Sequence, residues 1–578
     1  MTTTTSSIDQ TTCRFPWLTM ERLAYGLLIL VPAIIRLVNL GQRALSPVEA
    51  STALRAWQTS QGLHPALDAG SPLLFSLQSL TFFVMGATDA LARIWPLLAI
   101  SALPLSFYFL REWLGRWQAL LAATLITLSP LANTFARRSD GVSFALLAAV
   151  IALAGWSRVV RNQSHGWALT LAGVALALLS GPGGVTILIA LAVLFLLTRD
   201  TLPDHPTGPA SGDWIIFGII LLTGGTAIFT RFDALGLMTI NLTQWLTDIS
   251  LSSRSLLLGF IRLAADEPML SLFGLLAIVW GLRQEQRTRA LSIAAGGAAL
   301  IAILQGPDVA YSRAAAAFFL ALPTAELLVH LARRGDFSFR SLEQLLFIAV
   351  LILLAFLSVY ALVTFAFDGD FSRLMIFFVS ILLGIMIVFL FVWFLGWQEV
   401  RGGLLITSLT LTLLFGVSMA WQLGFNDTLP TLARVSPTEA LPDVKDMIRT
   451  YGDLSEHQTG DRWATEVVLI PGSRSDDMIQ WYLRRAEDFH IVHSVSAENP
   501  PAIIIAPAEQ VLTLGDHYAG QRFALLSSWD IGLVASLNQG IQWFFFRRAP
   551  FPPPAANAVN LWAQLDLLNL EQNLNASN

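Results

Sequence analysis

Long apolar runs occupy most of the first three-quarters of the chain. Stretches such as 345–367 and 374–394 are about as long as the 20 apolar residues that cross the hydrocarbon core of a bilayer as a helix. A soluble amphipathic helix would instead carry polar residues along one face. The pattern predicts an all-α polytopic membrane bundle of about thirteen transmembrane helices. The expected spans are residues 20–40, 90–111, 117–135, 141–160, 166–180, 183–198, 214–229, 268–283, 290–305, 314–332, 345–367, 374–397 and 403–423.

Two of the segments between spans are long. Loop 41–89 contains an amphipathic stretch, 47–61, and an apolar segment, 72–86, which is too short to span and suits a re-entrant or interfacial helix. Loop 230–267 mixes apolar and charged residues. Long loops in compact proteins tend to be functional or disordered, and these two are too apolar for disorder. We therefore expect both loops to lie on the membrane surface and to cover a cavity.

The pattern changes after residue 425, where short strand-like runs alternate with helix-like segments. This alternation predicts a small α/β domain over residues 426–548. Residues 549–578 are proline-rich and then polar, which predicts a linker followed by a loose end. The strand-like runs are 466–470, 502–506, 523–528 and 542–546, and the helix-like segments are 438–451 and 475–485.

Composition supports the membrane assignment. Of the 578 residues, 54% are hydrophobic and 13% are charged, and the mean hydropathy is +0.61. Soluble proteins carry about 25% charged residues. The net charge of −5 gives no support for a nucleic-acid partner. Because Cys13 is the only cysteine, the sequence excludes a disulfide framework and a cysteine-based metal site.

Arginine placement predicts the orientation, because cytoplasmic loops are enriched in arginine and lysine. If 72–86 is not a span, the arginines between spans gather on one side. Residues 1–19 are then a cytoplasmic tail, 20–425 form the transmembrane domain, and the α/β domain lies outside the cytoplasm, in a multi-pass protein of the plasma or inner membrane. The arginines on the expected cytoplasmic side are Arg22, Arg111, Arg116, Arg158, Arg161, Arg199, Arg283, Arg287, Arg289, Arg333, Arg334, Arg340 and Arg401.

Candidate chemistry is concentrated at the opposite, outer face. The sequence has no phosphate-binding P-loop, paired-histidine metal motif or nucleophile elbow. Glu49 begins the amphipathic stretch, and Asp140 follows the third span two residues after the pair Arg137 and Arg138. Asp140 or Ser139 could simply cap the fourth span. Alternatively, the two arginines could bind lipid-phosphate oxygens while the carboxylates serve an acceptor or a metal ion.

Several short motifs occur in a fixed order around these residues. They are RLVNLG at 36–41, SPVEA at 46–50, PLLF at 72–75, GATDALAR at 86–93, LGR at 114–116, SP at 129–130, ARRSD at 136–140, SGP at 180–182 and QWYLR at 480–484. Together they resemble the GT-C superfamily of polyprenyl-phosphate-sugar glycosyltransferases. The resemblance is to the branch of protein O-mannosyltransferases, lipid A aminoarabinose transferases and flippase-activity-associated membrane proteins, and it is closest to the last group.

The resemblance implies inverting transfer of a sugar from an undecaprenyl- or dolichyl-phosphate donor to a glycan, lipid or protein outside the cytoplasm. The family places an acidic pair at its catalytic centre, and here Val48 replaces the first acid and only Glu49 remains. Ser71 stands where some relatives have a lysine.

We therefore assign Glu49 as general base and Asp140 as an orienting or metal ligand. The residues expected to bind the substrate and its lipid phosphate are Arg137, Arg138, Asp68 and Arg55. Asp68 is also a candidate to replace the missing acid. A divalent ion (Mg²⁺, Mn²⁺ or Zn²⁺) held by Glu49 and Asp140 is a further expectation of this assignment.

Two other functions are compatible with the sequence. Because Val48 cannot accept a proton, the chain could be an inactive scaffold or partner subunit that has kept the fold. A transporter or lipid flippase is less favoured, because transporters often carry internal repeats and ionisable groups at mid-membrane. This chain has no evident repeat, and its candidate charges lie at the outer face.

Overall fold

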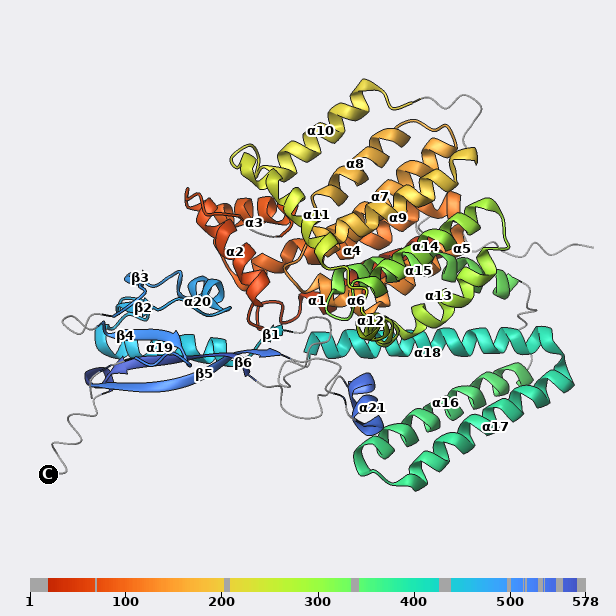
Figure 1. The fold of residues 1–578 in the computed structure, drawn as a ribbon. Helices are drawn as coiled ribbons and strands as arrows, with labels where there is room; N and C mark the ends of the chain where they lie inside the picture. Colours follow the sequence, from red (N-terminus) through yellow and green to blue (C-terminus); the bar gives the residue numbers. More distant parts are fainter. Residues whose placement is uncertain are drawn as a thin grey trace, which may run out of the picture.

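The computed structural model shows a helical membrane domain joined to a C-terminal domain built on one sheet, which we call the outer domain after its predicted side of the membrane (Figure 1). It describes residues 19–67, 70–201, 208–333, 342–425, 438–495, 501–512, 514, 517–528, 534, 536–546 and 555–568. The expected tail 1–19, apart from residue 19, and Asp68, Arg334 and Arg340 lie outside these residues.

The helices of the membrane domain follow the apolar runs closely. They are α1 (Met20–Leu37), α2 (Pro47–Ser60), α3 (Pro72–Met85), α4 (Asp89–Leu114), α5 (Arg116–Leu128), α6 (Pro130–Ala136), α7 (Val142–Val160), α8 (Gly166–Leu178), α9 (Pro182–Leu197), η1 (Arg199–Thr201), α10 (Ser211–Gly225), η2 (Phe232–Gly236), α11 (Leu237–Thr247), α12 (Ser253–Asp266), α13 (Pro268–Gly281), α14 (Gln286–Leu304), α15 (Ala310–Arg333), α16 (Leu342–Asp368), α17 (Phe371–Leu395) and α18 (Trp397–Phe425).

Each expected span contains a helix, but fewer helices are long and apolar enough to cross a bilayer alone. Among the described residues seven qualify, namely α4, α7, α14, α15, α16, α17 and α18, and nine qualify if the bent pairs α5–α6 and α12–α13 each form one span. Helices α8, α9 and α10 are apolar but have only 13, 16 and 15 residues. The chain is a multi-pass membrane protein in which the length and composition of the described helices support seven to nine spans, and the count of thirteen stays a prediction.

The two bent pairs break where proline starts the second helix, at Pro130 with a bend of 63° and at Pro268 with a bend of 107°. A break leaves backbone N–H groups that need new partners inside a membrane protein. Glu267 supplies one, because its Oε1 accepts hydrogen bonds from the Ser129 hydroxyl and, at 3.0 Å, from the Leu131 N–H. A residue at the break between α12 and α13 therefore stabilises the break between α5 and α6.

Contacts at one end of the bundle join several arginines of the expected cytoplasmic side. Arg111 lies 3.8 Å from Glu21, and Arg161 pairs with Glu112. The neighbouring Gln286 donates to the Leu197 carbonyl at 2.9 Å. These contacts join the start of α1 to the ends of α4 and α7, and the start of α14 to the end of α9. They agree with the predicted grouping, and which side is cytoplasmic stays a prediction.

The opposite end carries the first outer loop. The short helix α3 is anchored to the turn between α8 and α9, because the Ser71 hydroxyl and the Leu73 N–H both donate to the Leu179 carbonyl, at 2.7 and 3.1 Å. Gly141 lies against the same turn, and a Cβ there would come within 2.1 Å of the Ser180 carbonyl oxygen. The other long loop, 230–267, contains η2, α11 and α12, so both long loops are largely helical.

The outer domain is a six-stranded mixed sheet with strand order β1-β5-β6-β4-β2-β3. Strand β2 pairs in parallel with β3 and β4, and the other pairings are antiparallel. Its elements are β1 (Thr438–Ala440), α19 (Asp443–Thr459), β2 (Val467–Leu469), α20 (Asp476–Leu483), β3 (Phe489–Ile491), β4 (Ile503–Pro507), β5 (Tyr518–Ser528), α21 (Leu537–Phe546), β6 (Ala555–Gln564) and η4 (Leu565–Leu568).

Two segments of this domain differ from the sequence prediction. The run 542–546 is not a strand but the end of α21, whose Ile541 packs on Phe365 and whose Gln542 donates to the Ala366 carbonyl at 2.6 Å. Contacts with α16 therefore determine its conformation. The range 549–578, expected to be a linker and tail, contains β6, which lies between β5 and β4. Its apolar side chains alternate into the core, which is a strand pattern that the preceding prolines obscured.

Candidate functional site

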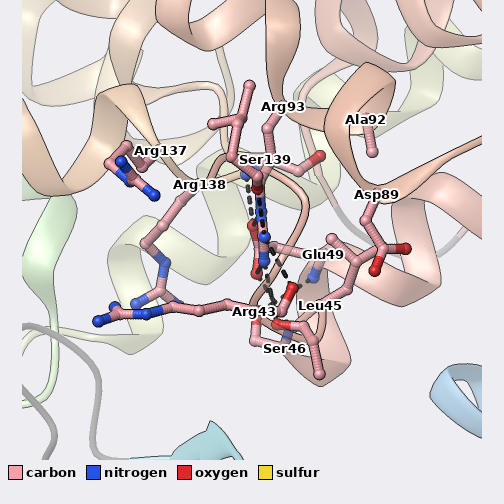
Figure 2. Close-up of polar contacts among 12 residues, drawn as sticks. Arg43, Leu45, Ser46, Glu49, Asp89, Ala92, Arg93, Arg137, Arg138 and Ser139 are labelled. Atoms are coloured by element: carbon pink, nitrogen blue, oxygen red, sulfur yellow. Dashed lines mark hydrogen bonds and ion pairs between the residues drawn. The ribbon is translucent and has the colours of Figure 1, made fainter. Parts of the chain in front are cut away.

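A buried ion pair between Glu49 and Arg93 lies at the centre of the candidate site (Figure 2). Arg93 Nε donates to Glu49 Oε1 and Nη2 donates to Oε2, both at 3.0 Å, so the pair is bidentate. Each residue is only 4% exposed. Glu49 occupies the third position of α2, where it forms a capping box with Ser46. The capping box therefore orients the carboxylate through contacts that are local in sequence.

The remaining acceptor sites of Glu49 are also occupied. Oε1 accepts the Ser139 N–H at 2.6 Å, and Oε2 accepts the Ser46 N–H at 2.9 Å. Each carboxylate oxygen therefore accepts two hydrogen bonds. In this arrangement no site is left on Glu49 for the hydroxyl of an acceptor.

The electrostatics of Glu49 lead to the same conclusion. Burial alone would raise the pKa of the Glu49 carboxyl, but the charge and hydrogen bonds of Arg93, the charge of Arg138 and the Ser139 N–H outweigh burial and hold that pKa at about 2. A carboxylate with such a low pKa has little affinity for a proton at neutral pH. Glu49 is therefore better suited to positioning neighbouring groups than to acting as a base.

Arg93 also holds the loop between α1 and α2. Its Nη1 donates to the carbonyls of Leu40 and Arg43 at 3.1 and 3.0 Å, and its Nη2 donates to the Ala44 carbonyl at 3.0 Å. Arg93 was not among the predicted site residues, although it ends the GATDALAR motif. The signal that could have found it is an arginine in an apolar helix, which needs a buried counter-charge such as Glu49.

Asp140 lies beside this ion pair but differs from Glu49 in its exposure and in the direction of its pKa shift. Its Oδ1 accepts the N–H of Val142, the first residue of α7, at 3.0 Å. The N-cap residue of α7 is Gly141, so the expected capping of this helix by the side chain of Asp140 or Ser139 is wrong. Asp140 is half-buried, and burial raises the pKa of its carboxyl, assisted by the charge of Glu49 and opposed by Arg138. Unlike Glu49, it combines partial exposure with an increased affinity for a proton.

The two predicted clamp arginines have different environments. Arg137 donates to the carbonyls of Arg36, Val38 and Asn39 at 3.3, 2.8 and 3.2 Å, and so it caps the end of α1. The Arg138 guanidinium is 3.8 Å from Glu439, with 19% of its side chain exposed. Arg43 and Arg138 extend to the same side, away from Arg93, as Figure 2 shows. Arg138 is therefore the better candidate for binding a phosphate.

The other predicted positions do not join this cluster. Arg55 donates to Ser51 at 2.7 Å and lies 3.4 Å from Asp477, so it links α2 to α20 of the outer domain. Val48, at the position of the missing acid, is 64% exposed. Asp68 lies outside the described residues.

The donor set does not suit a divalent ion. Within the described part of the chain, no group of three or more His, Cys, Asp or Glu side chains is placed to hold a metal. Both oxygens of Glu49 are engaged by Arg93, whose positive charge would repel a cation. The expected Glu49–Asp140 metal site therefore lacks suitable ligands in this arrangement.

Comparison with solved structures identifies the fold. The structure matches crystal structures of ArnT from Cupriavidus metallidurans, in the form bound to undecaprenyl phosphate (13% identity, TM-score 0.54, 84% of this chain and 93% of that chain) and in the apo state (12%, 0.52, 85% and 94%). The fold is GT-C-like. Archaeal oligosaccharyltransferase AglB from Archaeoglobus fulgidus gives a TM-score of only 0.44 at 12% identity, over 85% of this chain and 70% of that chain.

The sequence itself gives no such match. No protein-family model and no curated protein matches it. At 13% identity the similarity to ArnT establishes the fold alone. The activity has to be argued from the site.

Proposed function

We propose that this chain is an integral membrane glycosyltransferase that moves a sugar from a polyprenyl-phosphate donor to an acceptor outside the cytoplasm. The observation that carries the proposal is the candidate site, in which the half-buried Asp140 adjoins Arg138 and a fixed Glu49–Arg93 pair. The order of the GT-C-like motifs and the similarity to ArnT support it.

The residues of this site can supply the groups that the transfer needs. Asp140 accepts the proton of the acceptor hydroxyl as the oxygen forms a bond to the anomeric carbon of the donor sugar. The bond from that carbon to the phosphate oxygen breaks, and the polyprenyl phosphate leaves as an anion. Arg138, with Arg43 on the same side, stabilises its negative charge. Glu49 and Arg93 position the Ser139 backbone directly before Asp140.

The test is a transfer assay on purified protein in nanodiscs with labelled polyprenyl-phosphate sugars. We expect Asp140→Asn to lower kcat/KM by roughly 10²–10⁴-fold, the usual contribution of a general base. Asp488→Asn, at an exposed position of the outer domain, is the matched control. Wild-type turnover should rise with pH with a midpoint above 3.8, the ordinary pKa of an aspartate, because burial raises the pKa of Asp140. Equal turnover in Asp140→Asn and wild type would refute the site assignment.

A non-catalytic scaffold is the second candidate, favoured by one specific observation. The exposed position of the expected acid is occupied by Val48, while the retained Glu49 is saturated by hydrogen bonds. In that case the wild-type protein transfers no sugar, Val48→Asp creates no activity, and affinity purification recovers a stable partner subunit.

A further inference from the structure

A cleft of about 480 Å³ separates the outer domain from the membrane domain. Its size falls within the range of small-molecule sites. One wall is formed by the loop after α1 and the start of α4, and the other by α19, α20 and the segments that follow them. Its lining residues are Gly41, Thr88, Asp89, Ala90, Lys445, Ile448, Arg449, Gly452, Arg462, Trp463, Tyr482, Arg484 and Arg485.

The lining is strongly cationic, with five basic residues and one acid, Asp89. Two of the basic residues hold the walls together. Lys445 donates to the carbonyls of Gly41 and Gln42 at 2.7 and 2.8 Å and lies 3.1 Å from Asp89. Arg484 donates to the Ala87 carbonyl at 2.6 Å.

The single acid of the lining is already neutralised by its neighbours. Besides its ion pair with Lys445, Asp89 accepts the Trp481 indole N–H at 2.9 Å and the Tyr482 hydroxyl at 3.0 Å. Its charge therefore contributes little repulsion toward an anion in the cleft.

Three arginines remain to face a ligand. Arg485 is exposed, and no hydrogen bond or ion pair to it is present among the described residues. The other two have only solvent-exposed partners: Arg449 lies 3.0 Å from Asp446, and Arg462 lies 2.7 Å from Asp453 and 3.3 Å from Glu456. Exposed ion pairs contribute little to stability, so a ligand can replace them.

We propose that this cleft binds a saccharide that carries a phosphate group. Arginine binds two phosphate oxygens at once, which favours phosphate as the anion. Trp463 and Tyr482 add aromatic surface against which a sugar ring can pack. The cleft is separate from the candidate active site, because Asp89 lies on the other side of the Glu49–Arg93 pair from Arg43 and Arg138 (Figure 2). The binding of a phosphorylated saccharide in this cleft does not depend on the proposed function.

The test is a calorimetric titration of the full-length protein, in phosphatidylcholine nanodiscs, with glucose 6-phosphate as probe and no sugar donor. We expect wild type to bind the probe and not glucose. Arg485→Gln should raise Kd by roughly tenfold, which corresponds to the loss of one charge-assisted hydrogen bond. Arg449→Gln combined with Arg485→Gln should raise it further. Arg522→Gln, an exposed cation of the same domain outside the lining, is the matched control and should leave Kd unchanged.

Four outcomes would overturn this inference. They are no binding of glucose 6-phosphate to wild type, equal Kd in Arg485→Gln and wild type, equal loss in Arg522→Gln, and equally good binding of glucose. A separate titration uses phosphatidylglycerol nanodiscs. If glucose 6-phosphate no longer binds there, the cleft is assigned to lipid headgroups instead. None of these outcomes depends on turnover, so failure here and failure of the transfer assay are distinguishable.

Discussion

At the scale of single residues, the role of a carboxylate depends on how many donors surround it. Glu49 receives four hydrogen bonds, two of them from the Arg93 guanidinium, which make it a stable anion. Asp140 accepts the Val142 N–H, and burial moves its pKa in the opposite direction. Two acids in one site can thus be separated into an anchor and a base by their environments.

The anchoring role of Glu49 can be tested through stability. Glu49→Gln leaves the buried Arg93 without its counter-charge, and breaking a buried pair in this way costs about 3–5 kcal/mol. We expect a large fall in Tm in detergent. Glu21→Gln, which disrupts a partly exposed pair with Arg111, should cost under about 1 kcal/mol. A double-mutant cycle with Arg93→Met measures the coupling, and an additive result would contradict the anchor.

Acidification provides an independent check of the same pair. The pKa of Glu49 is about 2 in the folded protein and 4.5 in its ordinary state. Because the folded-state pKa is the lower one, the ionised Glu49 carboxylate contributes fully to the free energy of unfolding above pH 4.5. This contribution is lost as the pH falls toward 2. The difference in Tm between wild type and Glu49→Gln should therefore be constant from pH 5 to 8 and shrink below about pH 4.5.

Several site residues could be predicted from sequence, and their partners could not. Asp140 and Arg138 stand out because charges next to long apolar runs are rare. The Glu49–Arg93 contact joins residues 44 positions apart, and the Ser139 N–H is 90 positions from its acceptor. Arg137 caps α1 because it donates to three backbone carbonyls. A sequence motif does not show where backbone carbonyls lie, so this role could not be predicted.

At the scale of elements, the breaks between helices position the side chains of the candidate site. Helix α6 is only 7 residues long, yet the segment that follows it carries Arg137, Arg138 and Asp140. Its first turn depends on Glu267, which is 3% exposed and lies at the break between α12 and α13. The orientation of these side chains is therefore determined from a segment more than a hundred residues away.

Removing this support should loosen the site without unfolding the bundle. Glu267→Ala leaves the Leu131 N–H and the Ser129 hydroxyl without their buried acceptor, at a cost of about 1–3 kcal/mol. We expect faster hydrogen exchange of residues 130–140 and reduced sugar transfer. Glu343→Ala, at the exposed start of α16, is the control and should change neither. Unchanged exchange at α6 in Glu267→Ala would disprove the coupling between the two breaks.

Element prediction succeeded where the signal was local. Apolar length alone located a helix in every expected span, because a membrane helix satisfies its own backbone hydrogen bonds. It failed for α21 and β6, whose conformations depend on partners elsewhere. The aromatic residues of α21 have high strand propensity, and contacts with α16 override it.

At the scale of the whole molecule, the number of crossings is decided by the short helices. Fifteen residues of α10 rise about 22 Å, whereas the hydrocarbon core is about 30 Å thick. Such a helix crosses only where the bilayer thins or where the flanking residues extend the path. Sequence hydropathy cannot distinguish a short span from a buried helix, because both are uniformly apolar.

Cysteine labelling tests both this crossing and the orientation. In a Cys13→Ser background, Ser164→Cys and Ala210→Cys probe the arginine-rich end, while Phe232→Cys and Glu509→Cys probe the other side; all four positions are exposed. In spheroplasts, a membrane-impermeant maleimide should label only Phe232→Cys and Glu509→Cys, and the other two should react after permeabilisation. Labelling of Ala210→Cys and Phe232→Cys from the same side would show that α10 does not cross. The reverse pattern at Ser164→Cys and Glu509→Cys would place the candidate site in the cytoplasm, where the proposed transfer to an external acceptor could not occur.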